Sequence, residues 1–172
     1  ASIHGFTLSL VKKLKLTKSF QVMDIAEVMN DLAAHNEVLQ TDKDRIIRSQ
    51  FRSYDFLPRV AAYLMRYREI KSSSFGMDRI PDAPAAIWWV DNFGNCKTTV
   101  LSDEGALIQK ICQQTTFKNL SRHDGLKDVP AGKPALITGS SGLGDKRFLE
   151  IVIQGGNAAN HFGLSSGENL LQ

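Results

Sequence analysis

The chain has 172 residues, of which 42% are hydrophobic and 23% are charged, a composition that supports a buried core and excludes an intrinsically disordered chain. The formal net charge is only +3. Because basic and acidic residues are interleaved rather than gathered into one basic patch, we do not expect nucleic acid as a partner.

The cysteines and the N-terminal residues indicate where the protein works. Cys96 and Cys112 form no CxxC pair and the histidines are scattered, so we expect neither a metal site nor a disulfide framework. Residues 1–16 are broken by Lys12 and Lys13, and therefore fit neither a signal peptide nor a membrane span. We expect a cytoplasmic protein with no membrane partner.

The N-terminal part of the chain shows mainly helical periodicity. Apolar residues within 6–16 predict an amphipathic helix whose lysines face water, and residues 19–23 predict a short strand. Asp24 is placed to cap a second helix that fades near His35. Glu27 stands three residues after Asp24, as in a capping box.

A loop and a third helix come next in the pattern. The polar stretch 36–44 predicts the loop. The helix is expected after Asp55, with Pro58 in its first turn, where a missing N–H costs little. Serines 72–74 and the prolines shortly after them indicate a boundary. We predict one domain over residues 1–76 and a second over residues 83–172.

The sequence pattern of the second domain predicts a small antiparallel β structure. Short runs of β-forming residues are separated by turns, which is typical of an antiparallel sheet or barrel. The clearest strands are expected at 86–90, 97–101, 134–138 and 147–154. The last of these is apolar on both faces except at Glu150, so we expect it to be central.

Two turns combine glycine with side-chain amides: Asp91-Asn-Phe-Gly-Asn95 and Gly155-Gly-Asn-Ala-Ala159. Amides offer donors and an acceptor that complement an adenine edge, and Phe93 offers a ring for stacking. The alternative is that both are ordinary turns that need Gly and Asn for left-handed backbone. From spacing alone, this alternative is the stronger interpretation.

The glycine-rich stretch 139–146 does not predict a phosphate loop. A Walker motif requires Gly-Lys-Ser/Thr, whereas Asp145 precedes Lys146 and no hydroxyl residue follows it. We interpret this stretch as a flexible hairpin loop.

The segments Val90–Val100 and Phe148–Ala159 together resemble the C-terminal domain of the S-adenosylmethionine (SAM) hydroxide adenosyltransferases, the family that also contains the SAM-dependent chlorinases and fluorinases. Gly132-Lys-Pro134 and Phe162–Gly167 occur in the family order, and Gln50–Ala62 is similar, more weakly, to the family's Thr-Phe-His-Gly-Arg-Asp segment. The resemblance implies an α+β fold, in which a mainly helical remnant of an N-terminal α/β domain precedes a small antiparallel β-barrel.

The resemblance also implies which residues bind an adenosyl ligand, either SAM or adenosine. Asp91 would reach the methionine amino group, while Phe93 and Asn95 would contact adenine. Gly156, Asn157 and Ala158 would line the adenine pocket with backbone groups. Ser140 or Ser141 would meet the methionine carboxylate, with Arg147 as a substitute in that role.

The water-activating residues of the family do not carry over. In the family, hydroxide or halide attacks the ribose C5′ and methionine leaves, and the hydrolases hold water with an Asp, an Arg and a His. Arg52 stands at the position of the His and cannot act as a base. The segment with the other two residues would precede Ala1. We expect SAM as substrate or ligand and no other cofactor.

We consider three hypotheses for the function. The first is a truncated or diverged family member that binds an adenosyl ligand without turnover. The second is a fragment of an active hydrolase that converts SAM and water to adenosine and methionine. The third is a non-catalytic assembly or interaction module. Because the family's sites lie between subunits of a trimer, the resemblance implies a homo-oligomer.

Overall fold

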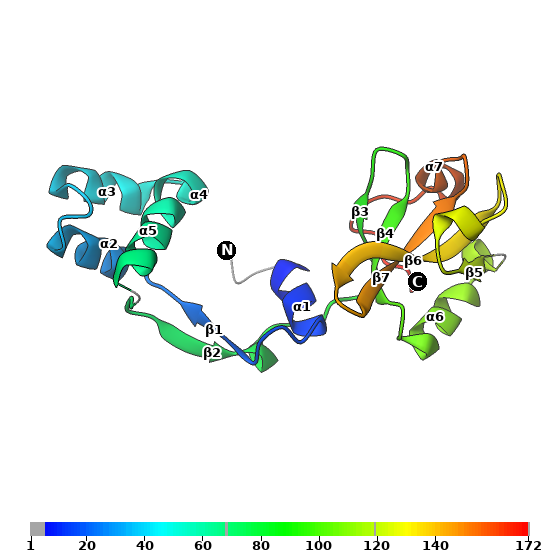
Figure 1. The fold of residues 1–172 in the computed structure, drawn as a ribbon, viewed down its shortest axis with the longest axis horizontal. Helices are drawn as coiled ribbons and strands as arrows, with labels where there is room; N and C mark the ends of the chain where they lie inside the picture. The colour runs from blue at the N-terminus through cyan, green and yellow to red at the C-terminus, as the bar shows by residue number, and fades with distance from the viewer. Residues whose placement is uncertain (1–5, 68, 119, 172) are drawn as a thin grey trace. The chain divides into compact units, whose positions relative to one another are not determined.

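The computed structural model describes residues 6–67, 69–118 and 120–171, and it combines helices with sheets, which confirms the α+β class (Figure 1). The chain divides into two compact units. The helical unit comprises residues 17–79, and the sheet unit comprises residues 1–16 together with 80–172. The assignment of 1–76 and 83–172 to the family's two domains stays a prediction.

The helical unit begins and ends with an antiparallel two-stranded ribbon. β1 (Ser19–Val22) pairs with β2 (Ser73–Gly76), and the Phe20 and Phe75 rings stack across it with centroids 5.9 Å apart. The strand predicted at 19–23 is confirmed. Two of the three serines interpreted as a boundary, Ser73 and Ser74, lie in β2, because pairing with a distant strand overrides their weak β-propensity.

The helix α2 (Ile25–Ala34) forms as the capping pattern predicts. Asp24 Oδ1 accepts a hydrogen bond from Glu27 N at 3.0 Å, which satisfies one of the free N–H groups of the first turn. Val28, Met29 and Leu32 are fully buried in the core of the helical unit. The cap therefore fixes the start of the helix and the apolar stripe fixes its orientation.

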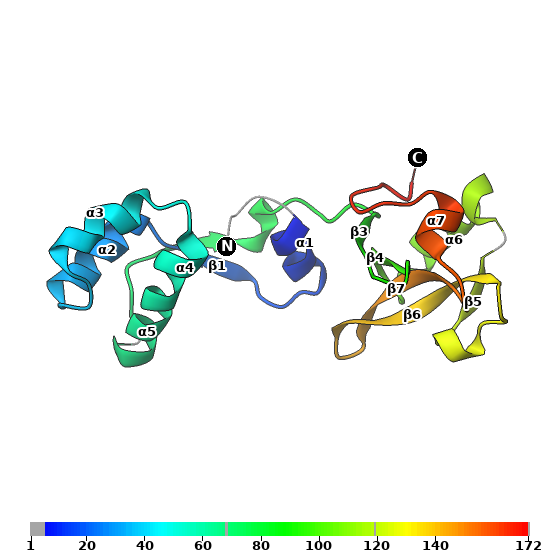
Figure 2. The same ribbon diagram turned by 90° about the horizontal axis from the view of Figure 1, so that it is seen from above.

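The loop predicted at 36–44 is wrong from residue 40 onward, where α3 (Gln40–Arg48) begins and packs beside α2 (Figures 1 and 2). Ile46 is its one buried side chain, so the sequence shows little apolar periodicity. Asp42 in the first turn and Arg48 in the last complement the helix dipole. The short α4 (Arg52–Asp55) and α5 (Leu57–Tyr67) follow, and α5 confirms the third predicted helix.

The sheet unit contains five strands in the order β3-β4-β7-β6-β5. Their bounds are Ile87–Val90 for β3, Cys96–Leu101 for β4, Ser121–His123 for β5, Pro134–Leu143 for β6 and Lys146–Ile153 for β7. As predicted, β7 is internal, since it pairs with both β4 and β6.

The predicted antiparallel barrel is not confirmed. The edge strands β3 and β5 lie at opposite ends of the strand order, so the sheet does not close. The β5–β6 pairing is parallel, because the connection through the 3₁₀ turn Leu126–Asp128 returns the chain in the same direction. The β6–β7 hairpin extends through residues 139–143, where we expected a loop.

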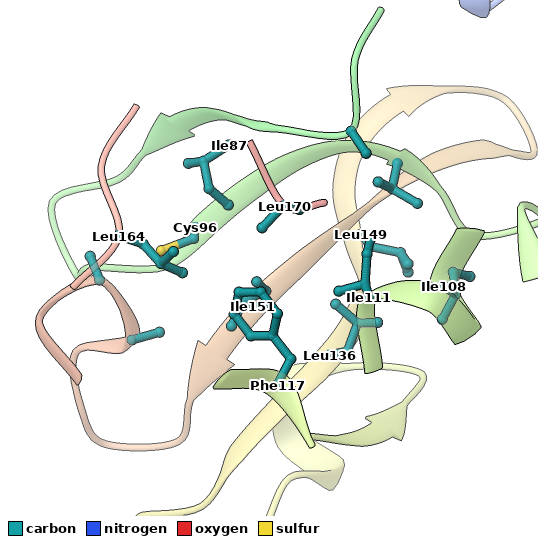
Figure 3. Close-up of a cluster of buried hydrophobic side chains, with 14 of the residues drawn as sticks. Ile87, Cys96, Ile108, Ile111, Phe117, Leu136, Leu149, Ile151, Leu164 and Leu170 are labelled. Atoms are coloured by element: carbon teal, nitrogen blue, oxygen red, sulfur yellow. The ribbon is translucent and has the colours of Figure 1, made fainter. Parts of the chain in front are cut away.

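Two helices complete the core of the sheet unit. The helix α6 (Gly105–Cys112), which the pattern did not predict, packs Ile108 and Ile111 against Leu149 and Ile151 of β7 (Figure 3). The short α7 (Ala158–Phe162) contributes buried alanines to the same cluster. One face of the sheet is thereby covered, which holds the strand ends in fixed positions.

The prediction that the lysines of the first helix face water is wrong for two of them. In α1 (Phe6–Lys13), Lys12 Nζ lies 2.8 Å from Asp82, and Lys13 Nζ lies 2.8 Å from Glu104. The Lys13 side chain is only 12% exposed. These lysines pair with acids of the sheet unit, so they do not form a free basic surface.

None of the helices in the described residues combines the length and the apolar character needed to cross a bilayer.

Candidate functional site

The register of two strands brings the amide-bearing turns to one end of the sheet. The turn 91–95 leads into β4, and the turn 155–159 follows β7. β4 and β7 are antiparallel, with Cys96 opposite Ile151, so the start of one strand lies beside the end of the other. We call these two segments, 91–95 and 155–159, the turn pair.

The two turns touch directly. Ala159 N donates a hydrogen bond to Gly94 O at 2.9 Å. Gly94 has φ +82°, and a Cβ atom at this position would lie 2.1 Å from the Asn157 side chain. Glycine is therefore required here both for its left-handed backbone and for the close approach of Asn157.

The second turn is ordered by a helix cap. Asn157 Oδ1 accepts from Asn160 N at 2.8 Å and so begins α7. Ala158 is fully buried, whereas Gly156 and Asn157 are exposed. A ligand at this turn would therefore meet backbone groups and the Asn157 amide rather than the Ala158 side chain.

The first turn is ordered by the carboxylate of Asp91. Its Oδ1 accepts from Phe93 N at 2.9 Å and from Asn95 N at 3.0 Å, and its Oδ2 accepts from Asn95 Nδ2 at 3.1 Å. The Phe93 side chain carries none of this network and is 78% exposed. The turn thus holds a bare aromatic ring at the surface.

These contacts change the acidity of Asp91. Burial raises the pKa of its carboxyl, but the hydrogen bonds from Asn95 and Phe93 and the charge of Lys97 outweigh burial and hold the pKa below its ordinary value. The carboxylate is therefore charged at neutral pH, and its charge stabilises the turn.

A buried ion pair lies beside the turn pair, and the sequence patterns did not single it out. Lys97 of β4 stands opposite Glu150 of β7, and Lys97 Nζ lies 2.9 Å from Glu150 Oε1. The side chains are 13% and 7% exposed. Gly139 provides the room, because a Cβ there would lie 2.3 Å from Glu150 Oε1. The available signal was that Lys97 is the one charged residue of β4 and Glu150 the one acidic residue of β7.

The candidates for the methionine carboxylate lie elsewhere on the sheet. Ser140 and Ser141 are in the outer part of β6, and Arg147 Nη1 donates to Ser140 O at 3.0 Å. Arg147 is the second residue of β7, whereas the turn 155–159 follows the last. At a strand rise of about 3.3 Å per residue, roughly 20 Å of β7 separates the two. Within the sheet unit, these residues do not join the turn pair.

Arg52 belongs to the helical unit, where it is exposed at the start of α4. An open cavity of about 460 Å³ in this unit is lined by Arg45, Arg48, Ser49, Gln50, Phe51 and Asp55. Hydrogen bonds from Ser49 and then Arg45 hold the pKa of Asp55 below its ordinary value. The arginine beside Asp55 is thus already paired within the unit.

The sheet unit, a mixed five-stranded sheet with a glycine- and amide-rich turn pair, matches a known domain. Residues 85–171 match the family model of the SAM hydroxide adenosyltransferase C-terminal domain. The match covers half of the chain, and the chain belongs to this family.

Two solved structures are similar to the chain at 20% identity. One is a conserved hypothetical protein from Thermus thermophilus, with a TM-score of 0.34, covering 56% of this chain and 40% of that one. The other is an uncharacterized conserved protein from Thermotoga maritima, with a TM-score of 0.43, covering 69% and 50%. The chain therefore spans half or less of their lengths. A comparison with curated proteins found no match.

The contact between Gly94 and Asn157 can be tested with a matched glycine. Gly132 also has a positive φ, but a Cβ there would meet nothing within 4 Å. We expect Gly132→Ala to cost about 1 kcal/mol of unfolding free energy, and Gly94→Ala to cost about 1–3 kcal/mol more because of the overlap. Urea unfolding measures both through tryptophan fluorescence, because both tryptophans lie in β3 of the sheet unit.

In an Asn157→Ala background, the excess cost of Gly94→Ala should shrink, since the overlapping side chain is gone. Equal costs for the two glycine variants would show that the turns do not touch as described.

The charge of Asp91 predicts a pH dependence of stability. Because its folded pKa lies below the ordinary 3.8, its contribution is present above that pH and is lost as the pH falls through the folded pKa. Asp91→Asn keeps an acceptor in the turn but removes the charge. We expect the wild type to be more stable than this variant by about 1 kcal/mol at pH 7. In urea titrations, the difference should shrink as the pH falls through the folded pKa of Asp91. A difference that does not change with pH would contradict a charged Asp91 in the turn.

Proposed function

We propose that the turn pair binds an adenosyl ligand, SAM or adenosine. The observation that carries the proposal is the contact between the two amide-bearing turns, through Ala159 N and Gly94 O and through the space that Gly94 leaves for Asn157. Membership of the SAM hydroxide adenosyltransferase family supports this ligand class.

The chemistry of the turn pair suits a flat, hydrogen-bonding ring. The exposed ring of Phe93 offers a stacking face, and aromatic stacking on a base contributes about 1–3 kcal/mol. Asn95 and Asn157 carry amide groups beside it, and Gly156 removes bulk. Adenine would stack on Phe93 and exchange hydrogen bonds with the amides and with the backbone of residues 156–158.

The site gives a ligand only partial cover from this unit. Because Phe93 is so exposed, a ring stacked on it would keep its other face open to solvent. A second surface would complete the site, which supports the homo-oligomer that the family resemblance implies. The trimer rests on the resemblance alone. The assembly is part of the proposal.

The methionine end of the ligand has weaker support than the adenine end. Asp91 remains our candidate for the amino group, and its retained charge supports that role. For the carboxylate, Ser140, Ser141 and Arg147 stay candidates by resemblance alone, since they lie at the other end of β7. Binding of adenosine is therefore the firmest element of the proposal.

Turnover of SAM is a separate question from binding. Arg52, at the position of the family's histidine, is exposed in the helical unit and cannot serve as a base. We propose binding without hydrolysis for the described residues, and conversion of SAM and water to adenosine and methionine as the alternative for a longer protein.

The binding proposal predicts the effect of removing the stacking ring. We expect adenosine to bind the wild type, and Phe93→Ala to weaken this binding about 5- to 100-fold, the equivalent of one stacked base. Leu143→Ala, which removes another exposed apolar side chain of the sheet unit, should leave the affinity within about twofold. Isothermal titration calorimetry measures all three.

Inosine provides a matched ligand control. It replaces the adenine amino group with a carbonyl, which reverses the hydrogen-bonding pattern offered to an amide, so it should bind more weakly than adenosine. If the wild type shows no heat with adenosine or SAM at millimolar concentration, the proposal is wrong.

A further inference from the structure

The buried carboxylate of Glu150 has no role in the function proposed above. Its side chain is 7% exposed and faces Lys97, whose Nζ lies 2.9 Å from Glu150 Oε1. No group in the described part of the chain donates a directed hydrogen bond to this oxygen, so Lys97 is the group that balances its charge. Burying a carboxylate costs free energy that an apolar side chain in β7 would not cost, which points to a role beyond packing.

Asp91, the second carboxylate near Lys97, keeps one acceptor position free. Each carboxylate oxygen can accept about two hydrogen bonds. Oδ1 accepts from two backbone N–H groups, those of Phe93 and Asn95. Oδ2 accepts from Asn95 Nδ2, whereas Lys97 Nζ lies 3.7 Å away, beyond hydrogen-bond distance. The Asp91 side chain is 18% exposed, which leaves it open to a ligand at the turn.

The balance of charge around Lys97 favours a cation at Asp91. One ammonium lies between two carboxylates, so the net charge of the three groups is −1, and the ammonium is closer to Glu150. Burial raises the pKa of Asp91, hydrogen bonds from Asn95 and Phe93 lower it, and the charge of Lys97 contributes least. Without Glu150, Lys97 would be drawn onto Asp91 Oδ2, where it would fill the free acceptor position and cancel the charge.

We propose that Glu150 is a positioning residue of the adenosyl site: by holding Lys97, it keeps the charge and the free acceptor position of Asp91 for a cationic group of the ligand. This inference rests on the proposed function, in which Asp91 is the candidate for the methionine amino group of SAM. The buried ion pair thereby selects an amino-acid tail on the nucleoside, whereas Phe93 and the turn amides hold the adenine.

The test compares two ligands that differ in the amino-acid tail. S-adenosylhomocysteine and 5′-methylthioadenosine are both uncharged thioethers of adenosine at sulfur, and the first also carries an ammonium and a carboxylate. We expect the full chain to bind S-adenosylhomocysteine more tightly. Glu150→Gln, which keeps the shape of the side chain, should lower the ratio of the two affinities by about tenfold. The affinity for 5′-methylthioadenosine should change by less than about threefold. Isothermal titration calorimetry measures both.

A double variant separates the effect of charge from that of structure. Lys97→Met/Glu150→Gln removes both members of the ion pair and leaves Asp91 with its charge. The ratio of affinities should therefore return to within about threefold of the wild-type value. A purely structural role of Glu150 predicts no such recovery, because the double variant lacks the same carboxylate.

Gly139→Ala tests the same role without removing a charge, and it serves in place of Glu150→Gln if that variant does not fold. A Cβ atom at Gly139 would lie 2.3 Å from Glu150 Oε1, so the carboxylate must move away from its place beside Lys97. We expect the ratio of affinities to fall. Gly105→Ala is the matched control, because a Cβ there would meet nothing within 4 Å, and it should leave the ratio unchanged.

The outcomes distinguish this inference from the proposed function. An unchanged ratio in Glu150→Gln, or in Gly139→Ala where it takes its place, would refute the role of Glu150 and leave the binding site standing. A ratio that stays low in the double variant, or a wild type that binds both ligands equally, would refute it too. A wild type that binds neither ligand would refute both the inference and the proposed function.

Discussion

The pairing of β4 with β7 is the constraint on which the candidate site depends. With Cys96 opposite Ile151, the turn that leads into β4 and the turn that follows β7 emerge at the same end of the sheet. The packing of β7 on both of its faces, with Ile151 in the cluster beside α6 and Val152 in a second buried cluster, fixes this register, because a shift of one residue would exchange the side chains that the strand presents to the two clusters. The hydrogen bond between Ala159 and Gly94 then joins turns that are about sixty residues apart in the sequence.

The sequence predicted elements where a local signal existed. The Asp24 cap and the stripe of α2 are contained within a few residues, as are the glycines and amides of the turn pair. The sequence did not predict α3, because a single buried residue produces no apolar periodicity. It also did not predict the pairing of the α1 lysines with Asp82 and Glu104, because those contacts form only in the tertiary structure. The prediction of a closed barrel is not confirmed for a similar reason, since closure depends on where the distant edge strand β5 pairs.

The candidate site shows the same division between local and distant information. Asp91, Phe93 and Asn95 were recognisable because one turn holds them all. The ion pair of Lys97 with Glu150 was not, because it depends on register across two strands.

The most direct test of the central claim, that the turn pair binds adenosine as one site, is an amide NMR titration of the full chain with adenosine. The account predicts that the resonances of residues 93–95 and 156–159 shift together along one saturation curve, since the two turns are in contact. Shifts confined to one of the two turns, or to the helical unit, would contradict it.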